Sequence, residues 1–107
     1  MTIGFGLSID DLNLPTAFRV HQNYPNPFNP STNIDYDLPE DSFVSITIFD
    51  MMGRIINQSV LDNESAGFKS FRWNGINDDG LQVSAGVYFY SIRTKNNFET
   101  RKMILLK

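Results

Sequence analysis

Carboxylates are the main candidates for chemistry in this chain. They form three short pairs, Asp35 with Asp37, Glu40 with Asp41, and Asp78 with Asp79. Two carboxylates can hydrolyse a glycosidic bond when they face each other across a cleft. The first pair is instead expected on the solvent face of a single strand, where charged side chains keep a protein soluble and protect sheet edges. The pairs therefore predict no glycosidase site.

Nucleophilic and thiolate chemistry is largely excluded by composition. The chain has no cysteine and a single histidine, His21, so it can form no disulfide, thiolate zinc site or multi-histidine metal site. A Ser-His-Asp relay could be built only through His21, and the alternation of its segment places this side chain on a polar, solvated face. We expect no cofactor and no enzymatic activity.

An oxygen-rich loop from Asn74 to Gly80 is the candidate metal site. Asn77, Asp78 and Asp79 are residue types that bind calcium, although the spacing and distal glutamate of an EF-hand are absent. Such residues also make ordinary turns through hydrogen bonds from side chain to backbone. A structural turn is the preferred interpretation, and a calcium site at Asn77, Asp78 and Asp79 is the alternative.

Length and charge narrow the class of protein. A chain of 107 residues corresponds to one domain, and a net charge of −3 excludes an electrostatically driven nucleic-acid binder. No run of 18 apolar residues could span a membrane as a helix. Residues 1–11 lack the basic and apolar regions of a signal peptide, so an export signal is expected upstream in a longer parent.

Alternating polar and apolar residues predict an all-β protein, an immunoglobulin-like antiparallel sandwich of about seven strands. Residues 1–16 show no sustained period and are expected to form a linker or loose lead-in, and residues 17–107 the folded domain. Side chains of shared parity are expected in the core: Ile34, Tyr36, Val44, Ile46, Ile48, Phe71, Trp73, Tyr88, Tyr90, Met103 and Leu105. Trp73, Tyr88 and Tyr90 could instead form an aromatic sugar platform, but alternation favours the core.

Local signals suggest three boundaries. Residues 18–22 alternate as a first strand, and residues 62–67 form a polar loop. Asn96 and Asn97 suit a two-residue hairpin turn, because asparagine tolerates a positive φ angle.

A proline-rich loop follows the first expected strand. It contains Asn23, Tyr24, Pro25, Asn26, Pro27, Phe28, Asn29 and Pro30. Three prolines within six residues fix three φ angles and remove three backbone donors, which indicates a defined, extended loop. Phe28 is expected to anchor this loop on the sandwich.

The proline-rich run, from Gln22 to Thr32, resembles the opening of the type A C-terminal sorting domains of the type IX secretion system. It is similar also to the immunoglobulin-like domain of the flagellar hook-assembly scaffold family. Matching motifs follow in order over residues 17–107: Phe49-Asp50-x-x-Gly53-Arg54, Ala66-Gly67, Trp73-Asn74-Gly75, Gly80, Gly86-Val87-Tyr88 and the terminal Lys102-Met103-Ile104-Leu105-Leu106-Lys107. Asn74 stands where the family often has aspartate.

The resemblance implies a non-catalytic sorting domain at the end of a larger secreted protein. Its implied partners are the type IX translocon with its shuttle components, a sortase-like protease, and the cargo domain upstream in the same chain. The parent would pass through the periplasm to the cell surface or the medium, with removal of the domain and attachment of the cargo. The domain itself is expected to be monomeric.

The C-terminal strand is expected to carry the sorting signal. Its residues are Lys102, Met103, Ile104, Leu105, Leu106 and Lys107. A strand at the chain end could offer its backbone edge and terminal charges to a receptor. The alternative is that Met103 and Leu105 only complete the core and both lysines are solvated. Two other functions stay open, a structural or adhesive module and a carbohydrate-binding module.

Overall fold

The computed structural model describes residues 2–3, 7–8 and 13–107. Every regular element in these ranges is a β-strand, so none of them contains a helix that could cross a membrane. The strands are β1 (Thr2–Ile3), β2 (Leu7–Ser8), β3 (Arg19–Val20), β4 (Thr32–Leu38), β5 (Ser42–Asp50), β6 (Ile55–Glu64), β7 (Gly67–Trp73), β8 (Gly86–Thr94) and β9 (Phe98–Leu105).

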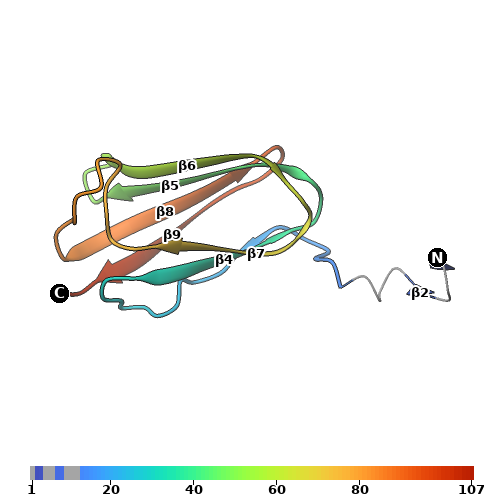
Figure 1. Cartoon of the computed structure of the whole chain (residues 1–107), viewed down its shortest axis with the longest axis horizontal. Coiled ribbons are helices and arrows are strands. Elements are labelled where there is room, and N and C mark those ends of the chain that lie inside the picture. Colours follow the sequence, from blue (N-terminus) through green and yellow to red (C-terminus); the bar gives the residue numbers. More distant parts are fainter. Residues whose placement is uncertain (1, 4–6, 9–12) are drawn as a thin grey trace.

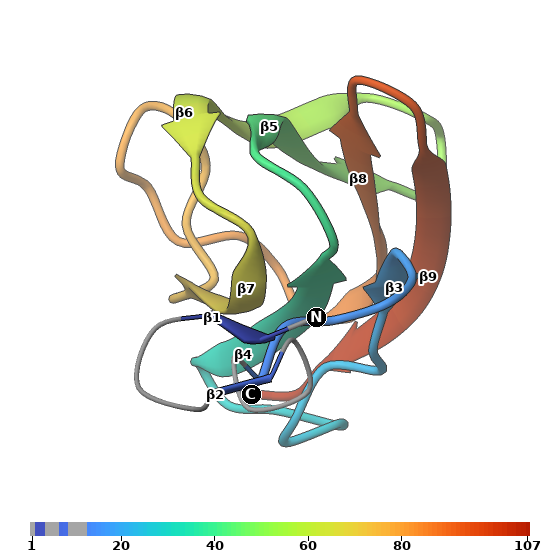
Figure 2. The ribbon, with the colours of Figure 1, turned by 90° about the vertical axis from the view of Figure 1, so that its right-hand side faces the viewer.

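Strands β3 to β9 form a sandwich of two antiparallel sheets (Figures 1 and 2). One sheet has the order β3-β4-β7 and the other β6-β5-β8-β9. The chain changes sheets from β4 to β5, from β6 to β7 and from β7 to β8, as in immunoglobulin-like sandwiches. The predicted all-β sandwich of seven strands is therefore confirmed.

The lead-in is only partly described. Strands β1 and β2 pair with each other, and the rest of residues 1–12 lies outside the described part of the chain. Pro15 is buried although it falls within the predicted lead-in. The boundary at residue 17 stays a prediction.

The core lies between the two sheets, where the inward faces of their strands meet. Its buried apolar side chains are Val20, Phe28, Ile34, Tyr36, Leu38, Val44, Ile46, Ile48, Trp73, Tyr88, Tyr90, Ile92, Met103 and Leu105. Ten of the predicted core side chains are among them, and Phe71 is partly buried against the cluster. Alternation thus predicted which face of each strand is buried.

Tyr88 makes a contact typical of immunoglobulin-like sandwiches. Its hydroxyl donates a hydrogen bond to the carbonyl of Ser84, at 2.6 Å, four residues upstream. Such a tyrosine corner fixes the entry of a strand into the second sheet. The Gly86-Val87-Tyr88 motif therefore has a structural role at the start of β8.

Three predicted boundaries were wrong. The first strand, β3, has two residues because the chain then turns into the proline-rich loop. Strand β6 continues to Glu64 through its pairing with β5, so residues 62–64 are not a loop. The last hairpin turns one residue earlier than predicted, at Lys95 and Asn96, and neither residue has a positive φ. The turn lies there because the amide of Thr94 donates to the carbonyl of Asn97 and the amide of Asn97 donates to the hydroxyl of Thr94.

The chain enters the sandwich at one end and its C-terminus lies at the other (Figure 1). Backbone pairing joins four segments at the end that contains the C-terminus. Asp50 pairs with Tyr88, Gly86 with Leu105, and Phe28 with Leu105. We call this the distal end. It contains the β5–β6 turn, the start of β8, the proline-rich loop and the chain terminus.

Candidate recognition site

The proline-rich loop is hydrogen bonded to the outer edge of β9. The amide of Phe28 donates to the carbonyl of Ile104 at 3.0 Å, and the amide of Leu106 donates to the carbonyl of Phe28 at 2.8 Å. The amide of Ile104 donates to the side-chain oxygen of Asn26 at 3.1 Å. The loop thus acts as an added, short parallel strand beside β9.

This contact overturns the expectation that β9 offers its backbone edge between residues 102 and 106. The side chain of Gln22 donates to the carbonyl of Lys102 at 2.7 Å, which extends the same row of hydrogen bonds. A receptor strand could pair here only by displacing the loop. The C-terminal strand therefore exposes side chains rather than this stretch of backbone.

The side chains of the C-terminal segment divide by parity. Met103 and Leu105 are buried in the core, whereas Lys102, Leu106 and Lys107 are exposed. Neither lysine forms an ion pair within the described residues. Both are therefore accessible to a partner, and recognition of these lysines stays a prediction.

A buried polar network holds the start of the loop. The side-chain amide of Asn23 donates to the carbonyl of Pro25 and to the hydroxyl of Thr32, at 3.1 and 3.0 Å. The Tyr90 hydroxyl accepts from the amide of Asn23 at 2.9 Å and donates to the carbonyl of His21 at 2.6 Å. Burial raises the pKa of Tyr90 to about 12, so this phenol stays protonated.

Phe28 anchors the loop in the core, as predicted. Its ring lies 5.8 Å from that of Trp73, which lies 5.6 Å from the ring of Tyr88. The indole of Trp73 donates to the carbonyl of Ile76 at 2.9 Å. Trp73, Tyr88 and Tyr90 are all buried, so they form no exposed sugar platform.

The outer part of the loop is held by its backbone and by one polar contact. Tyr24 exchanges two backbone hydrogen bonds with Asn33, yet its side chain is 79% exposed. The peptide bonds before Pro25, Pro27 and Pro30 are all cis. The side-chain oxygen of Asn74 accepts from the hydroxyl of Ser31 at 2.9 Å, so asparagine supplies here the acceptor that aspartate would also provide.

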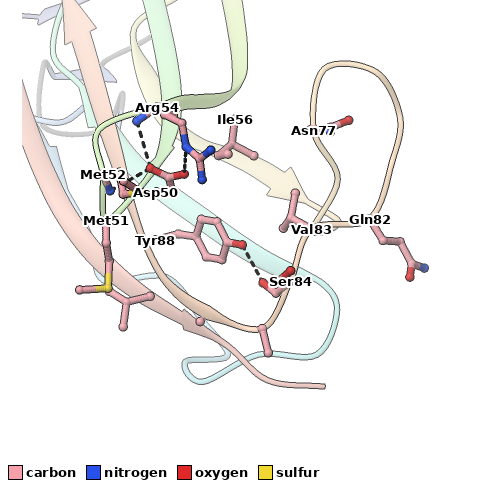
Figure 3. A pocket seen from close by; sticks show the side chains of 13 residues that line it. Asp50, Met51, Met52, Arg54, Ile56, Asn77, Gln82, Val83, Ser84 and Tyr88 are labelled. Carbon is pink, nitrogen blue, oxygen red and sulfur yellow. Dashed lines mark hydrogen bonds and ion pairs between the residues drawn. The ribbon is translucent and has the colours of Figure 1, made fainter.

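The β5–β6 turn is braced by a single carboxylate (Figure 3). Asp50 accepts hydrogen bonds from the amides of Met52 and Arg54, at 2.9 and 3.0 Å, and from Nε of Arg54 at 2.8 Å. Burial alone would raise the pKa of Asp50, but these donors and the guanidinium charge together lower it below its ordinary value. The turn leaves the side chains of Met51 and Met52 72% and 80% exposed.

A shallow pocket lies between this turn and residues 82–88 (Figure 3). Its wall contains the Asp50–Arg54 pair, and the Tyr88 hydroxyl donates to the carbonyl of Ser84. Within the described ranges, no three His, Asp or Glu side chains are grouped so as to hold a metal ion. The pocket thus offers apolar and charged contact surface.

The loop from Asn74 to Gly80 uses its polar side chains for its own turn. The side-chain oxygen of Asn77 accepts from the amides of Asp79 and Leu81, both at 2.9 Å. Asp78 accepts from the amide of Gln58 at 3.1 Å and so attaches the loop to the edge of β6. These bonds support the preferred interpretation of a structural turn, and calcium binding stays an untested alternative.

The acidic pairs are dispersed. Asp37 was expected on a solvent-exposed, edge-protecting face, but β4 is the central strand of its sheet, and Asp37 is only 9% exposed. His21, which directly follows the neighbouring β3, covers it, with Nε2 at 2.9 Å from its carboxylate. Asp35 is exposed, as expected. Glu40 and Asp41 accept hydrogen bonds from adjacent turns.

Comparison with solved structures shows where this fold occurs. It is similar to part of dimeric latent PorU from Porphyromonas gingivalis, with a TM-score of 0.67, 20% identity and coverage of 86% of this chain and 9% of that one. It is similar also to part of PorZ, a surface component of the type-IX secretion system of the same organism. The TM-score is 0.59 and the identity 22%, with coverage of 82% of this chain and 11% of that one. FlgD from Xanthomonas campestris has a TM-score of 0.57 and 22% identity, with coverage of 85% of this chain and 63% of that one. The chain thus spans about a tenth of the first two proteins, and these likenesses show the fold.

The family is shown by sequence. No curated protein matches the chain, but the model of the secretion system C-terminal sorting domain matches residues 22–106. This range includes the proline-rich loop and the whole of β9. The domain is therefore a sorting signal of a larger, secreted protein that reaches the cell surface or the medium. The chain belongs to the secretion system C-terminal sorting domains, which confirms its resemblance to the sorting domains of type IX secretion.

Proposed function

We propose that this domain directs its parent from the periplasm through the type IX outer-membrane translocon, and that side chains of residues 102–107 form part of the signal. The observation that carries the proposal is the family match over residues 22–106. The exposure of Lys102 and Lys107, beside the buried side chains of Met103 and Leu105, supports it.

The finer steps follow from this role. The translocon and its shuttle components are the direct partners of the domain, which acts as a monomer without catalysis. A sortase-like protease removes the domain after transit, and the cargo is attached to the cell surface or released. Residues 1–16 form the connection to the cargo, and residues 17–107 the sorting unit.

A transfer experiment tests the proposal. The chain is fused behind a periplasmic passenger protein in a type IX host, and the passenger is measured in the periplasm and outside the cell. We expect passenger outside the cell only when both the domain and a working translocon are present. Passenger that stays in the periplasm, or that leaves without the translocon, would contradict the proposal.

A structural module is the second candidate. It is favoured by the likeness to FlgD, a hook-capping protein, of which the chain covers 63%. In that case the passenger would stay in the periplasm, and the purified chain would assemble with itself or with a scaffold protein.

A further inference from the structure

The outer face of the four-stranded sheet carries an apolar area at its distal end. Pairing across the sheet aligns Ile55 with Phe49, Phe49 with Phe89, and Phe89 with Lys102. The rings of Phe49 and Phe89 stack with centroids 5.7 Å apart. Val87 and Ile104 also pair on this face, two residues closer to the distal end than Phe89 and Lys102.

We call these side chains, together with that of the adjoining turn residue, the distal patch: Phe49, Met51, Ile55, Val87, Phe89 and Ile104. Ile55 and Met51 are 60% and 72% exposed, and the others are partly buried. The next row of this face is polar, with Gln58, Thr47, Ser91 and Thr100 aligned across the four strands. The patch is therefore bounded and contiguous.

Contiguity sets this patch apart from ordinary exposed apolar residues. Single exposed apolar residues are normal on a protein surface, but contiguous ones mark interaction sites. Asp50 and Gly53 hold the β5–β6 turn, the latter with a φ of +82°, so the turn does not depend on the side chain at Met51. Methionine is flexible and well suited to contact a partner.

Cations border the patch. Lys102 lies in the same row as Phe89, and the side chain of Arg54, next to Ile55, is 73% exposed. The guanidinium of Arg54 is paired with the carboxylate of Asp50 at 2.8 Å, whereas Lys102 forms no ion pair among the described residues. The whole chain is acidic, with a net charge of −3, but the uncompensated charge at this border is the cation of Lys102. It favours a partner that places a carboxylate beside an apolar centre.

The position of the patch suits a sorting signal. The chain enters at the opposite end of the sandwich, so an upstream cargo leaves the distal end accessible (Figure 1). Three motifs of the family resemblance contribute to the patch or its border, namely those of Asp50 to Arg54, Gly86 to Tyr88 and Lys102 to Lys107. The proline-rich loop covers the edge of β9 and leaves this face open.

We propose that the distal patch is the surface through which a protein of the sorting machinery binds the folded domain. The partner places apolar side chains on the patch and a carboxylate beside Lys102. The inference rests on the proposed sorting function and names the face, rather than the edge, of the C-terminal strand as the part that is recognised.

Two substitutions on one strand form a matched test. Ile55 and Val60 both lie on β6, point to the same face and are 60% and 59% exposed, but Val60 lies beyond the polar row. Ile55→Glu and Val60→Glu are made in the full-length parent, and the fraction outside a type IX host is measured. We expect Ile55→Glu to lower this fraction about tenfold and Val60→Glu to leave it unchanged.

Stability is checked on the purified chain. Both variants should keep the melting temperature within about 4 °C of the parent sequence, because the side chains are exposed. If Ile55→Glu lowers it further, Met51→Glu in the braced turn makes the same test.

Three outcomes would overturn the inference in distinguishable ways. Equal export of both stable variants, with export still dependent on the domain, would refute the patch and keep the sorting function. Export of the parent without the domain would refute the sorting function itself. Binding of the chain to phosphatidylglycerol vesicles, lost in Ile55→Glu, would show that the patch binds a lipid rather than a protein.

Discussion

The amide of Phe28 donates a hydrogen bond to the carbonyl of Ile104, and this joins the proline-rich loop to the C-terminal strand. The ring of Phe28 is buried beside Trp73, so the loop cannot leave the strand without exposing an aromatic side chain. The two sequence motifs at opposite ends of the domain are thus one structural unit. The loop gives the C-terminal segment its shape.

Two asparagines of the loop should differ in their effect on stability. Asn23→Ala removes buried hydrogen bonds to Pro25 and Thr32 and should lower the free energy of unfolding by about 1–3 kcal/mol. Asn29 is exposed, and Asn29→Ala should change the free energy of unfolding by less than about 0.5 kcal/mol. Urea unfolding of both variants measures the difference. Equal losses would show that the buried network does not stabilise the loop.

Two glycines separate backbone strain from steric contact. Gly80 has a φ of +81° and open space around it, so Gly80→Ala should cost about 1 kcal/mol. Gly75 has a φ of +72°, and an added Cβ would lie 3.0 Å from the carbonyl oxygen of Pro30. Gly75→Ala should therefore cost clearly more in the free energy of unfolding. A smaller loss at Gly75 than at Gly80 would argue against close packing of the loop there.

Acid should remove the contribution of Asp50. Since folding lowers the pKa of this carboxyl, its stabilising effect is present above the unfolded pKa of about 3.9 and is lost as the pH falls through the folded value. Asp50→Asn should lower the melting temperature at pH 7. The melting temperatures of the variant and of the parent sequence should converge as the pH falls below about 4. A difference that stays constant with pH would show that the charge of Asp50 is not involved.

Calcium should leave the melting temperature of the chelated protein unchanged. Asn77 and Asp78 already accept hydrogen bonds from the backbone, which a bound ion would have to replace. A site of even millimolar affinity would stabilise the folded state in excess calcium. A rise in melting temperature on titration would establish the alternative interpretation of this loop.

Strand alternation predicted most of the core because a period of two determines which side chains point inward. Ile34 and Tyr36 on β4 follow this rule. Asp37 breaks it: it is buried because His21, directly after the two-residue strand β3, covers the outer face of the sheet there. Nothing in the local sequence of β4 contains that information.

The C-terminal segment was predictable in its buried residues but not in its exposed surface. The lysine-bounded apolar run correctly placed Met103 and Leu105 in the core. That its edge is covered depends on pairing between Phe28 and Ile104, which are far apart in the chain. Phe49 interrupted the polar face of its strand, and this was the sequence signal of the distal patch.

The most direct test of the proposal that residues 102–107 form part of the sorting signal uses the two lysines of this segment. Lys102→Ala combined with Lys107→Ala should change the free energy of unfolding by less than about 0.5 kcal/mol, because both side chains are exposed. The measurement is the fraction of parent protein outside a native type IX host, with the melting temperature as its control. Our account predicts retention of the stable double variant in the periplasm. Normal delivery to the cell surface would contradict it, since the lysines would then not be part of the signal.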